Sequence, residues 1–397
     1  MRRKSTVFLL LYLLPGAALY AAQDNSTKSP WSVDLEVGIG YDSNAYLSPD
    51  NAYTDYAPTI PVAVTPVTRS GMFMPVSLDL EYDGRGSKKF GFVGSYSFDG
   101  DFYADSDTKN ANEYNHKVSA GAEFLLKSKG RREDTIRVEP YYVVHDKTYF
   151  NRDTGDQMVS NLGTDLSDRY SYKLTGLMVE LKRETTRIQH SIHLEMATRD
   201  YVEPTSTAFD SYDHDYFRVG GDVEFELADP TKLTVGYDYY TRDYDEWRAR
   251  DLTGTSVDGT RREYVYNQVG ASLRQKLNAD VTLYLDYTLT DRADQYLGYS
   301  DYVKNEYGLR LIYSKNRLRL KAKASWWERD YDNAYAFDEP TQDDMNYKSA
   351  EYSLKGDYDL DEHHGVWAEA KTIDQKSTDL RYEYDRTQIM VGWRWEN

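Results

Sequence analysis

The feature that most constrains the fold of this chain is a two-residue alternation of apolar and polar side chains. Near the C-terminus, the odd positions carry Ile389, Val391 and Trp393, whereas Gln388 and Arg394 stand at even positions. Successive side chains of a β-strand point to opposite faces, so such a strand meets an apolar phase on one side and water on the other. The pattern recurs about sixteen times, often over about 10 or more residues, which is the length that crosses a bilayer at a tilt. It is typical of a transmembrane β-barrel.

The start of the chain has the features of a secretory leader. It shows a charged group at residues 2–4, a short apolar run at residues 7–14 and a cleavage site at Ala21 or Ala22. No later segment approaches the roughly 20 apolar residues that a spanning helix needs. Any membrane-crossing segments of the mature chain are therefore expected to be strands.

The predicted domain organisation has three parts. Residues 1–22 form a signal peptide, residues 23–30 a short periplasmic N-terminal segment, and residues 31–397 a transmembrane β-barrel. The chain shows no linker rich in Pro, Gly or Ser and no change of composition that would separate two soluble domains. We therefore expect one folded unit after the leader.

Composition excludes several classes of protein. The mean hydropathy is -0.76, yet 14% of the residues are aromatic and 38 are tyrosine, whereas disordered acidic chains lack aromatic residues. A net charge of -18 argues against nucleic acid as a partner, because phosphate binding needs a basic surface. The absence of cysteine fits an exported protein without disulfides, and it excludes thiolate metal sites and cysteine catalysis.

The connections between the predicted strands alternate between short and long. Short turns include residues 228–232 and 277–280, and long loops include residues 42–70 and 147–168. Outer-membrane barrels have short periplasmic turns and long outer loops. Soluble sandwiches, barrels and propellers also alternate, but their strands are commonly about five or six residues long. We therefore predict an all-β fold, a transmembrane antiparallel up-and-down β-barrel of about 16 strands, within a range of about 14–18.

The polar faces of the predicted strands would line the lumen of this barrel. A closed barrel of about sixteen strands is wide enough for an aqueous channel, and so many charges could not be buried dry. Most of the predicted lumenal charges are acidic and four are basic. This distribution predicts an electric field across the lumen and a preference for cations. The alternative, that these charges form salt bridges that only hold the wall, stays open. The predicted pore-lining residues are Asp34, Glu36, Asp79, Glu81, Asp222, Glu224, Glu226, Asp238, Asp286, Arg310, Arg319, Lys321 and Lys323.

Aromatic residues suggest where the outer membrane interface lies. Three Arg-Asp-Tyr repeats stand where an outward-running strand reaches its long loop, and we predict that their tyrosines belong to the outer aromatic girdle, with Arg and Asp pairing at the rim. A further strand is predicted to place Tyr172, Leu174 and Met178 on its apolar outer face. The three repeats are Arg199-Asp200-Tyr201, Arg242-Asp243-Tyr244 and Arg329-Asp330-Tyr331.

The first long loop is weakly charged and contains Pro49, Pro58, Pro61 and Pro66. It is predicted either to fold inward as a constriction or to pack on a neighbouring subunit, and a mobile surface loop is the alternative. Residues 147–168 show no recognisable constriction-loop motif.

The histidines do not form a recognisable catalytic constellation. His145 and His193 fall on predicted lumenal positions, and the triplet Asp213-His214-Asp215 lies near an outer rim. Alternate residues of a strand point to opposite faces, so this triplet does not gather around one point. No nucleophile motif accompanies these residues. We expect no enzyme activity, no cofactor and no metal site.

The segment from Gly38 to Tyr46 reads Gly-Ile-Gly-Tyr-Asp-Ser-Asn-Ala-Tyr, and Asp42 and Asn44 are expected to cap the strand with an Asx turn. This run resembles the first strand of barrels in the porin-like bacterial outer-membrane superfamily, including barrels associated with exopolysaccharide export or surface-lipoprotein modification. The C-terminal alternation that ends near Trp395 resembles the assembly signal of such barrels.

The sequence thus predicts a channel in the bacterial outer membrane for passive passage of small hydrophilic solutes. One alternative is an exopolysaccharide export or secretion pore, in which Trp327 and Trp367 would stack on sugar rings. Another is a non-conducting structural or adhesion barrel plugged by the first long loop. The expected partners are outer-membrane lipid and lipopolysaccharide, the barrel assembly machinery, and a hydrophilic solute or a polysaccharide.

Overall fold

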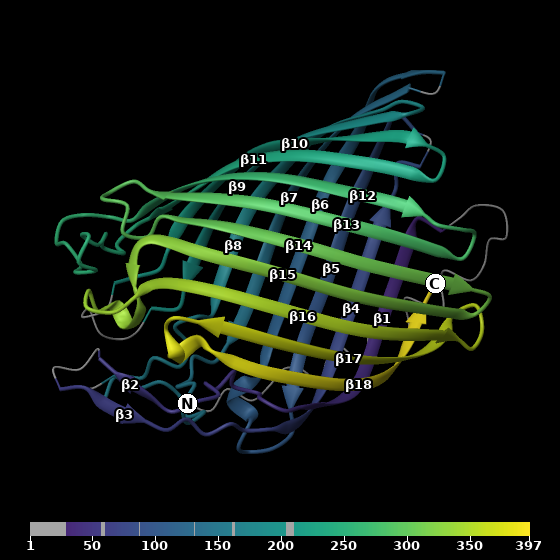
Figure 1. The fold of residues 1–397 in the computed structure, drawn as a ribbon. Coiled ribbons are helices and arrows are strands. Elements are labelled where there is room, and N and C mark those ends of the chain that lie inside the picture. Colours follow the sequence, from purple (N-terminus) through teal and green to yellow (C-terminus); the bar gives the residue numbers. More distant parts are fainter. Residues whose placement is uncertain (1–28, 57–59, 87, 131, 161–162, 204–209) are drawn as a thin grey trace.

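The computed structural model describes residues 29–56, 60–86, 88–130, 132–160, 163–203 and 210–397. Sixteen antiparallel strands form one closed barrel, in which each strand pairs with the next and the last pairs with the first (Figure 1). The predicted all-β, up-and-down barrel of sixteen strands is therefore confirmed. The predicted signal peptide lies outside the described residues.

The barrel strands are 12 to 18 residues long. They are β1 (Trp31–Asp42), β4 (Gly71–Asp83), β5 (Phe90–Tyr103), β6 (Glu113–Lys129), β7 (Arg132–Lys147), β8 (Tyr172–Glu184), β9 (Ile188–Tyr201), β10 (His214–Ala228), β11 (Thr231–Tyr244), β12 (Glu263–Lys276), β13 (Val281–Asp294), β14 (Tyr302–Lys315), β15 (Leu318–Tyr335), β16 (Asp344–Asp359), β17 (His364–Ser377) and β18 (Tyr384–Glu396).

The remaining regular elements lie in the long loops. The first long loop contains a separate two-stranded sheet, and three other loops each contain one turn of 3₁₀ helix. None of the helical segments in the described part of the chain is long and apolar enough to cross a membrane. These elements are β2 (Tyr53–Asp55), β3 (Val62–Val64), η2 (Lys109–Ala111), η3 (Ala336–Asp338) and η4 (Leu380–Tyr382).

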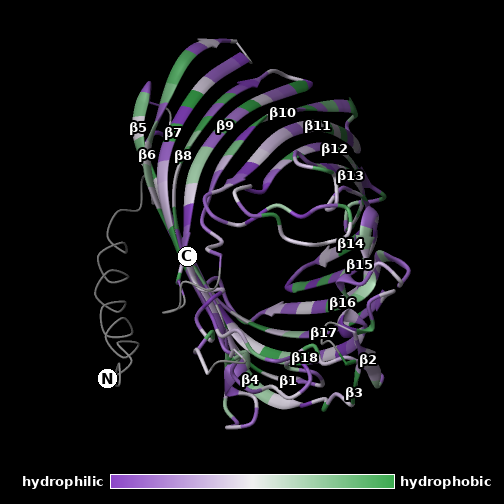
Figure 2. Ribbon diagram, turned by 90° about the vertical axis from the view of Figure 1, so that its left-hand side faces the viewer, coloured by the Kyte–Doolittle hydropathy of each residue, from purple (hydrophilic) through white to green (hydrophobic). Residues whose placement is uncertain are grey.

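The two faces of the barrel strands differ in polarity. Outward apolar side chains are widely exposed, as at Ile39 (60%), Phe92 (65%) and Ile192 (57%). Green and purple residues alternate along the ribbons in Figure 2, which views the barrel from its long-loop end. A continuous band of exposed apolar side chains is stable only against an apolar phase. The outer face is therefore suited to lipid, as in transmembrane barrels.

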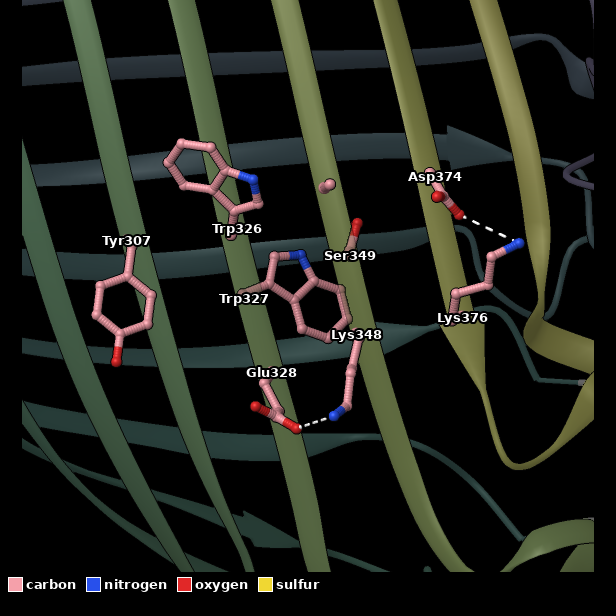
Figure 3. Close-up of a pocket in the computed structure, with 9 residues that line it drawn as sticks. Tyr307, Trp326, Trp327, Glu328, Lys348, Ser349, Asp374 and Lys376 are labelled. Carbon is pink, nitrogen blue, oxygen red and sulfur yellow. Dashed lines mark ion pairs between the residues drawn. The ribbon is translucent and has the colours of Figure 1, made fainter.

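The outer surface changes character toward the long-loop end. Tyr307 of β14 and Trp326 of β15 are paired in the strand register, and both project from the apolar face (Figure 3). The next outward position on β15 is Glu328, which forms an ion pair of 2.5 Å with Lys348 (Figure 3). Because tyrosine and tryptophan prefer the membrane–water interface, this ion pair marks the outer edge of the apolar band.

The wall is compact where the first and last strands meet. A Cβ atom added to Gly392 of β18 would lie 2.5 Å from the indole of Trp367, and one added to Gly38 of β1 would lie 2.8 Å from it. Glycine at both positions lets the ring of Trp367 lie against the backbone of two neighbouring strands. Trp367 is only 6% exposed, so it lacks the free ring face that the predicted stacking on sugar requires.

One strand faces the opposite way from the prediction. On β8, Tyr172, Leu174 and Met178 lie on the inner face, where Leu174 pairs with Arg199. The outer face of β8 is formed by the alternate set, which includes the exposed Leu177. The prediction was wrong because β8 carries apolar residues on both faces, and alternation alone does not then fix which face meets lipid.

Candidate functional site: the lumen and its outer mouth

The inner face of the barrel carries the charged residues that the sequence predicted for the lumen. The strand register places all thirteen on the face opposite the exposed apolar side chains. Contacts over intervening strands show that this face is the concave one: Lys355 Nζ on β16 lies 2.8 Å from Glu36 Oε2 on β1, although β17 and β18 separate their strands. A pore-lining function of these residues stays a prediction.

Some of the lumenal charges are neutralised within the wall. Glu224 accepts from Lys232 at 2.5 Å. Asp238 accepts from Arg218 at 2.9 Å and contacts His193 at 2.6 Å, across the intervening strand β10. These pairs are the salt bridges that the alternative interpretation predicted, and they account for part of the charged set.

Five carboxylates on three neighbouring strands form no ion pair with any described residue. We call this group the acidic wall; its side chains share one face, and the register sets Asp34 directly beside Asp79. Like charges at this spacing repel each other unless water and mobile cations screen them. The acidic wall consists of Asp34, Asp79, Glu81, Asp99 and Asp101.

Basic side chains dominate the inner face of β14 and β15. This basic ladder consists of Arg310, Arg319, Lys321 and Lys323. Within the described ranges, only Lys323 has a carboxylate partner, Glu351 at 3.4 Å. Strands β16, β17 and β18 separate the basic ladder from the acidic wall. The lumen therefore contains an acidic and a basic region three strands apart, which creates a field between them.

The loop between β7 and β8, described at residues 148–160 and 163–171, reaches over the mouth of the barrel. Arg152 Nε donates to the carbonyl oxygen of Leu47 at 2.8 Å, and its guanidinium lies 5.3 and 5.2 Å from the ring centroids of Tyr382 and Tyr384. Four strands, β6, β5, β4 and β1, separate β7 from β18 along the wall, so these contacts carry the loop across the mouth instead of along the rim. Burial lowers the pKa of Arg152.

The first long loop holds this crossing segment in place. Tyr53 of β2 donates to the carboxylate of Asp153 at 2.9 Å, and its ring packs 5.9 Å from that of Phe337. The amide of Val67 donates to the carbonyl oxygen of Asp153 at 2.7 Å. Burial raises the pKa of Asp153, while the hydrogen bond from Tyr53 acts in the opposite direction. The sheet β2–β3 lies beside the outer ends of β17 and β18 (Figure 2). The crossing segment therefore belongs to the loop between β7 and β8, and the first long loop contacts it from the rim.

A buried polar network joins the first and last strands. The fully buried carboxylate of Asp42 accepts hydrogen bonds from Arg386 at 2.5 Å, Tyr103 at 2.6 Å and Gln388 at 3.2 Å. It also accepts from the backbone amide of Asn44 at 2.9 Å, which is the predicted Asx turn. The Gly-Tyr-Asp-x-Asn run therefore does more than cap a strand, because it closes the barrel.

Tyrosine and arginine side chains line the inner face of nine consecutive strands, β8 to β16, at their long-loop ends. We call this feature the tyrosine–arginine belt. Neighbouring rings contact each other along it, with centroid distances of 4.7 Å for His214 and Tyr244 and 4.2 Å for Tyr240 and Tyr266. The belt comprises Tyr172, Arg199, Tyr201, His214, Tyr216, Tyr240, Arg242, Tyr244, Tyr264, Tyr266, Arg292, Tyr302, Arg329, Tyr331 and Tyr347.

The prediction of an outer aromatic girdle made of the three Arg-Asp-Tyr repeats was wrong. Tyr201, Tyr244 and Tyr331 all lie on the inner face, and their neighbouring aspartates lie on the outer face. The arginines of the repeats stack on rings, as Arg199 does at 4.4 Å from the centroid of Tyr172. The error came from treating tyrosine as an interfacial residue instead of continuing the alternation along each strand.

The belt opens into a cavity of about 240 Å³ between β11 and β15. We call it the arginine pocket, because four arginines contribute to its lining together with five tyrosines, Trp247 and a single carboxylate, Asp338. The arginines are Arg242, Arg250, Arg262 and Arg292.

Sequence reasoning missed the belt and the pocket, although a signal for them was present. Asp238 was predicted to be lumenal, and two-residue steps from it lead to Tyr240, Arg242 and Tyr244 on the same face. The loop residues of the pocket, such as Trp247, follow no periodicity and could not have been placed in this way.

The three histidines that the sequence placed in the lumen or at the outer rim, His145, His193 and His214, have structural partners. His193 contacts Asp238, and His214 is buried with its Nδ1 2.9 Å from the carbonyl oxygen of Tyr212. His145 lies 3.5 Å from Glu113. In the described part of the chain, no group of three or more His, Asp or Glu residues is arranged to hold a metal ion.

No protein-family model and no curated protein sequence matches the chain. Similar solved structures include an anion-selective porin from Comamonas acidovorans, at 11% identity, 92% coverage of this chain, 98% of that chain and a TM-score of 0.44. OccAB3 of Acinetobacter baumannii matches at 11% identity with 92% and 99% coverage and a TM-score of 0.45. The outer membrane channel DcaP of the same organism matches at 12% identity with 94% and 99% coverage and a TM-score of 0.41. The assignment of the fold rests on the strand pairing, not on these likenesses.

Proposed function

We propose that the protein is a bacterial outer-membrane channel for passive passage of small hydrophilic solutes, with a preference for cations. The observation that carries this proposal is the contrast between an apolar outer face and a charged inner face on one closed barrel of sixteen strands. A barrel of this strand number is wide enough to hold water. Unpaired charges on its inner face would be very unfavourable in a dry interior.

Two features would set the selectivity of the channel. The acidic wall offers mobile cations a continuous row of carboxylates, and the basic ladder faces it from another part of the lumen. The resulting field would orient zwitterionic solutes and slow those without charge separation. The described parts of the loop between β7 and β8, residues 148–160 and 163–171, reduce the free area of the mouth and thereby set the size limit.

The proposed partners follow from the same surfaces. The apolar outer face and its interfacial rings Tyr307 and Trp326 are suited to outer-membrane lipid and lipopolysaccharide. The alternating C-terminal strand β18 is suited to the barrel assembly machinery, as the sequence resemblance implied. A hydrophilic solute would occupy the lumen.

Single-channel conductance of the refolded protein in a planar bilayer tests this proposal. Under a salt gradient, the sign of the reversal potential is expected to show cation preference. Replacing Asp34, Asp79 and Asp99 together by asparagine should reduce that preference, because these carboxylates have no fixed cation. The matched control is Glu224→Gln, which removes a carboxylate already neutralised by Lys232 and should leave the reversal potential nearly unchanged. A folded but silent protein would contradict the proposal.

The contacts of the first long loop favour a second candidate, a barrel kept closed by its own loops. Tyr53 and Val67 fix Asp153 in the crossing segment. Deleting residues 53–68 removes both contacts and should raise the conductance. If the intact protein is silent and the deletion variant conducts, the closed barrel is the better description.

The tyrosine–arginine belt favours a third candidate, an exopolysaccharide export pore. Trp327 lies on the inner face with Lys304 Nζ 4.7 Å from its ring centroid, so its ring stands near the lumen and beside a cation. Block of the single-channel current by neutral and acidic oligosaccharides distinguishes this candidate from a channel for small solutes only. Passage of small ions without any block would count against export.

A further inference from the structure

We propose that the arginine pocket binds a single sugar ring that carries a carboxylate, a sugar acid of the uronate type. This inference goes beyond the proposed function, because it assigns a ligand to a site in the wall that ion conduction does not require.

The first argument is the charge of the pocket. Among the described residues, only Arg250 of the four arginines has a carboxylate partner, Asp338 at 2.5 Å. Arg262 donates through Nε to the carbonyl oxygen of Arg248 at 2.9 Å, and its guanidinium lies 3.7 Å from the ring centroid of Trp247. Neither of these neighbours carries a negative charge. Guanidiniums remain protonated in proteins, so the pocket keeps an excess of positive charge.

The other two arginines are held by aromatic rings. Arg292 lies 4.4 and 4.2 Å from the centroids of Tyr264 and Tyr302, and its Nε donates to the carbonyl oxygen of Ser300 at 2.9 Å. Arg242 lies 5.3 Å from the centroid of Tyr266. Stacking fixes the plane of each guanidinium but provides no counter-charge. Both groups are therefore oriented in advance for an anion.

The carboxylates nearby in the register are already engaged. Asp294 pairs with Tyr264 between β13 and β12, and its oxygens accept from the backbone amides of Tyr296 and Ser300. It faces the belt, but these amides fix it in the loop that follows β13. Backbone amides carry no charge and do not neutralise a carboxylate, but the four arginines of the pocket still outnumber the carboxylates Asp294 and Asp338. The pocket therefore keeps an excess of positive charge.

The second argument is shape. At about 240 Å³, the cavity falls below the roughly 300–1,000 Å³ of common ligand sites, which limits the ligand to about one ring. Four of the five pocket tyrosines are buried, but the rings of Trp247 and Tyr331 are partly exposed. Such flat aromatic faces stack on the apolar faces of sugar rings, and phenolic hydroxyls bond to sugar hydroxyls. The planar fork of arginine matches a carboxylate in a bidentate geometry, better than a point charge does. A carboxylated sugar ring satisfies all of these groups together.

The sugar acid could arrive by two routes, as a solute in the lumen or as part of a surface glycan at the outer mouth. The chemistry of recognition is the same in both cases. The experiment therefore measures binding first and the route separately.

Binding is tested by calorimetry on the full-length, detergent-refolded protein, with glucuronate, glucose and acetate as probes. Saturable binding of glucuronate is expected. Glucose and acetate should each bind more weakly by about tenfold or more, because glucose lacks the carboxylate and acetate lacks the sugar ring. Arg242→Gln and Arg292→Gln should each weaken glucuronate by about tenfold. Retained strand signal in circular dichroism shows that a variant has folded.

The matched control is Arg199→Gln, a belt arginine that stacks on Tyr172 but does not line the pocket. It should leave glucuronate binding unchanged. A variant that binds more tightly cannot be explained by misfolding. Asp338→Asn removes the only carboxylate among the described residues that line the pocket and should strengthen glucuronate binding several-fold. Absence of saturable binding to the folded wild type overturns the inference. So does equal affinity for glucose, or an equal loss in Arg199→Gln.

The route is read from the current. Glucuronate added on the long-loop side is expected to reduce the single-channel current of the wild type if it enters as a solute, and to bind without any effect on the current if the pocket serves a surface glycan. Either result is consistent with a sugar-acid site. A silent barrel that binds glucuronate would overturn only the channel, and a conducting barrel that does not bind it would overturn only this inference.

Discussion

Replacing Asp42 by asparagine is expected to destabilise the barrel strongly. The carboxylate is fully buried and accepts from Arg386, Tyr103, Gln388 and the amide of Asn44. Asparagine keeps the shape but replaces one acceptor oxygen by a donor and removes the charge that balances Arg386. Breaking a buried ion pair by removing one partner costs about 3–5 kcal/mol. Because Arg386 keeps some access to solvent, with a side chain 18% exposed, we expect the lower end, about 3 kcal/mol.

The assay is equilibrium unfolding in urea of protein refolded into lipid vesicles, followed by tryptophan fluorescence. The matched control is Asp79→Asn. Asp79 is a lumenal carboxylate of the acidic wall and forms no ion pair in the described structure, so this variant should change the free energy of unfolding by no more than about 0.5 kcal/mol. The double variant Asp42→Asn, Arg386→Gln should lose less than the sum of the two single changes, since neither charge is then left alone. A loss below about 1 kcal/mol for Asp42→Asn would refute the reasoning.

Three further outcomes are expected. Gly392→Ala should cost about 1–3 kcal/mol of unfolding free energy in the same assay, because the new Cβ would lie 2.5 Å from the indole of Trp367. The control is Gly270→Ala, which should be tolerated because the nearest atom to its new Cβ lies 4.0 Å away. Burial raises the pKa of Asp153 above 3.8, so protonation of this carboxyl favours the docked position of residues 148–156. Docking should be weakest above the raised pKa and should strengthen as the pH falls through it. Hydrogen exchange of residues 148–156 measures this change. Tyr53→Phe should speed that exchange at neutral pH by removing the hydrogen bond to Asp153, and an unchanged rate would show that the bond does not hold the loop.

The sequence predicted the strand number and the closed topology because both depend on local information. Alternation fixes which residues share a face, and the length of each connection fixes the end of the barrel at which it lies. Both signals survive without knowledge of any tertiary contact. The face of β8 was lost because Leu174 and Leu177 are equally apolar, so alternation gave two equivalent solutions.

The candidate site could be predicted only in part. The lumenal charges follow from the same alternation, and all thirteen lie on the inner face. Pairing between them depends on the register of strands far apart in the chain, as for Lys355 and Glu36, and no local pattern contains it. The crossing of the loop between β7 and β8 is likewise decided by contacts of Arg152 and Asp153 with other loops. Three tyrosines of the belt, Tyr201, Tyr244 and Tyr331, were assigned to the outer girdle because residue type was given more weight than position.

The tyrosine–arginine belt also has a mechanical consequence. A wide hoop of strands joined edge to edge bends easily, and its outline can flatten into an ellipse at little cost. Along β8 to β16, contacts between rings and guanidiniums act as a stiff inner arch that resists this bending. Among the described residues, the remaining arc, from β17 through β1 to β7, has no such arch and relies on the strut formed by the contacts of Arg152 and Asp153. Fluctuations in the width of the mouth should therefore concentrate on that arc, so the two sides of the opening differ in compliance as well as in charge.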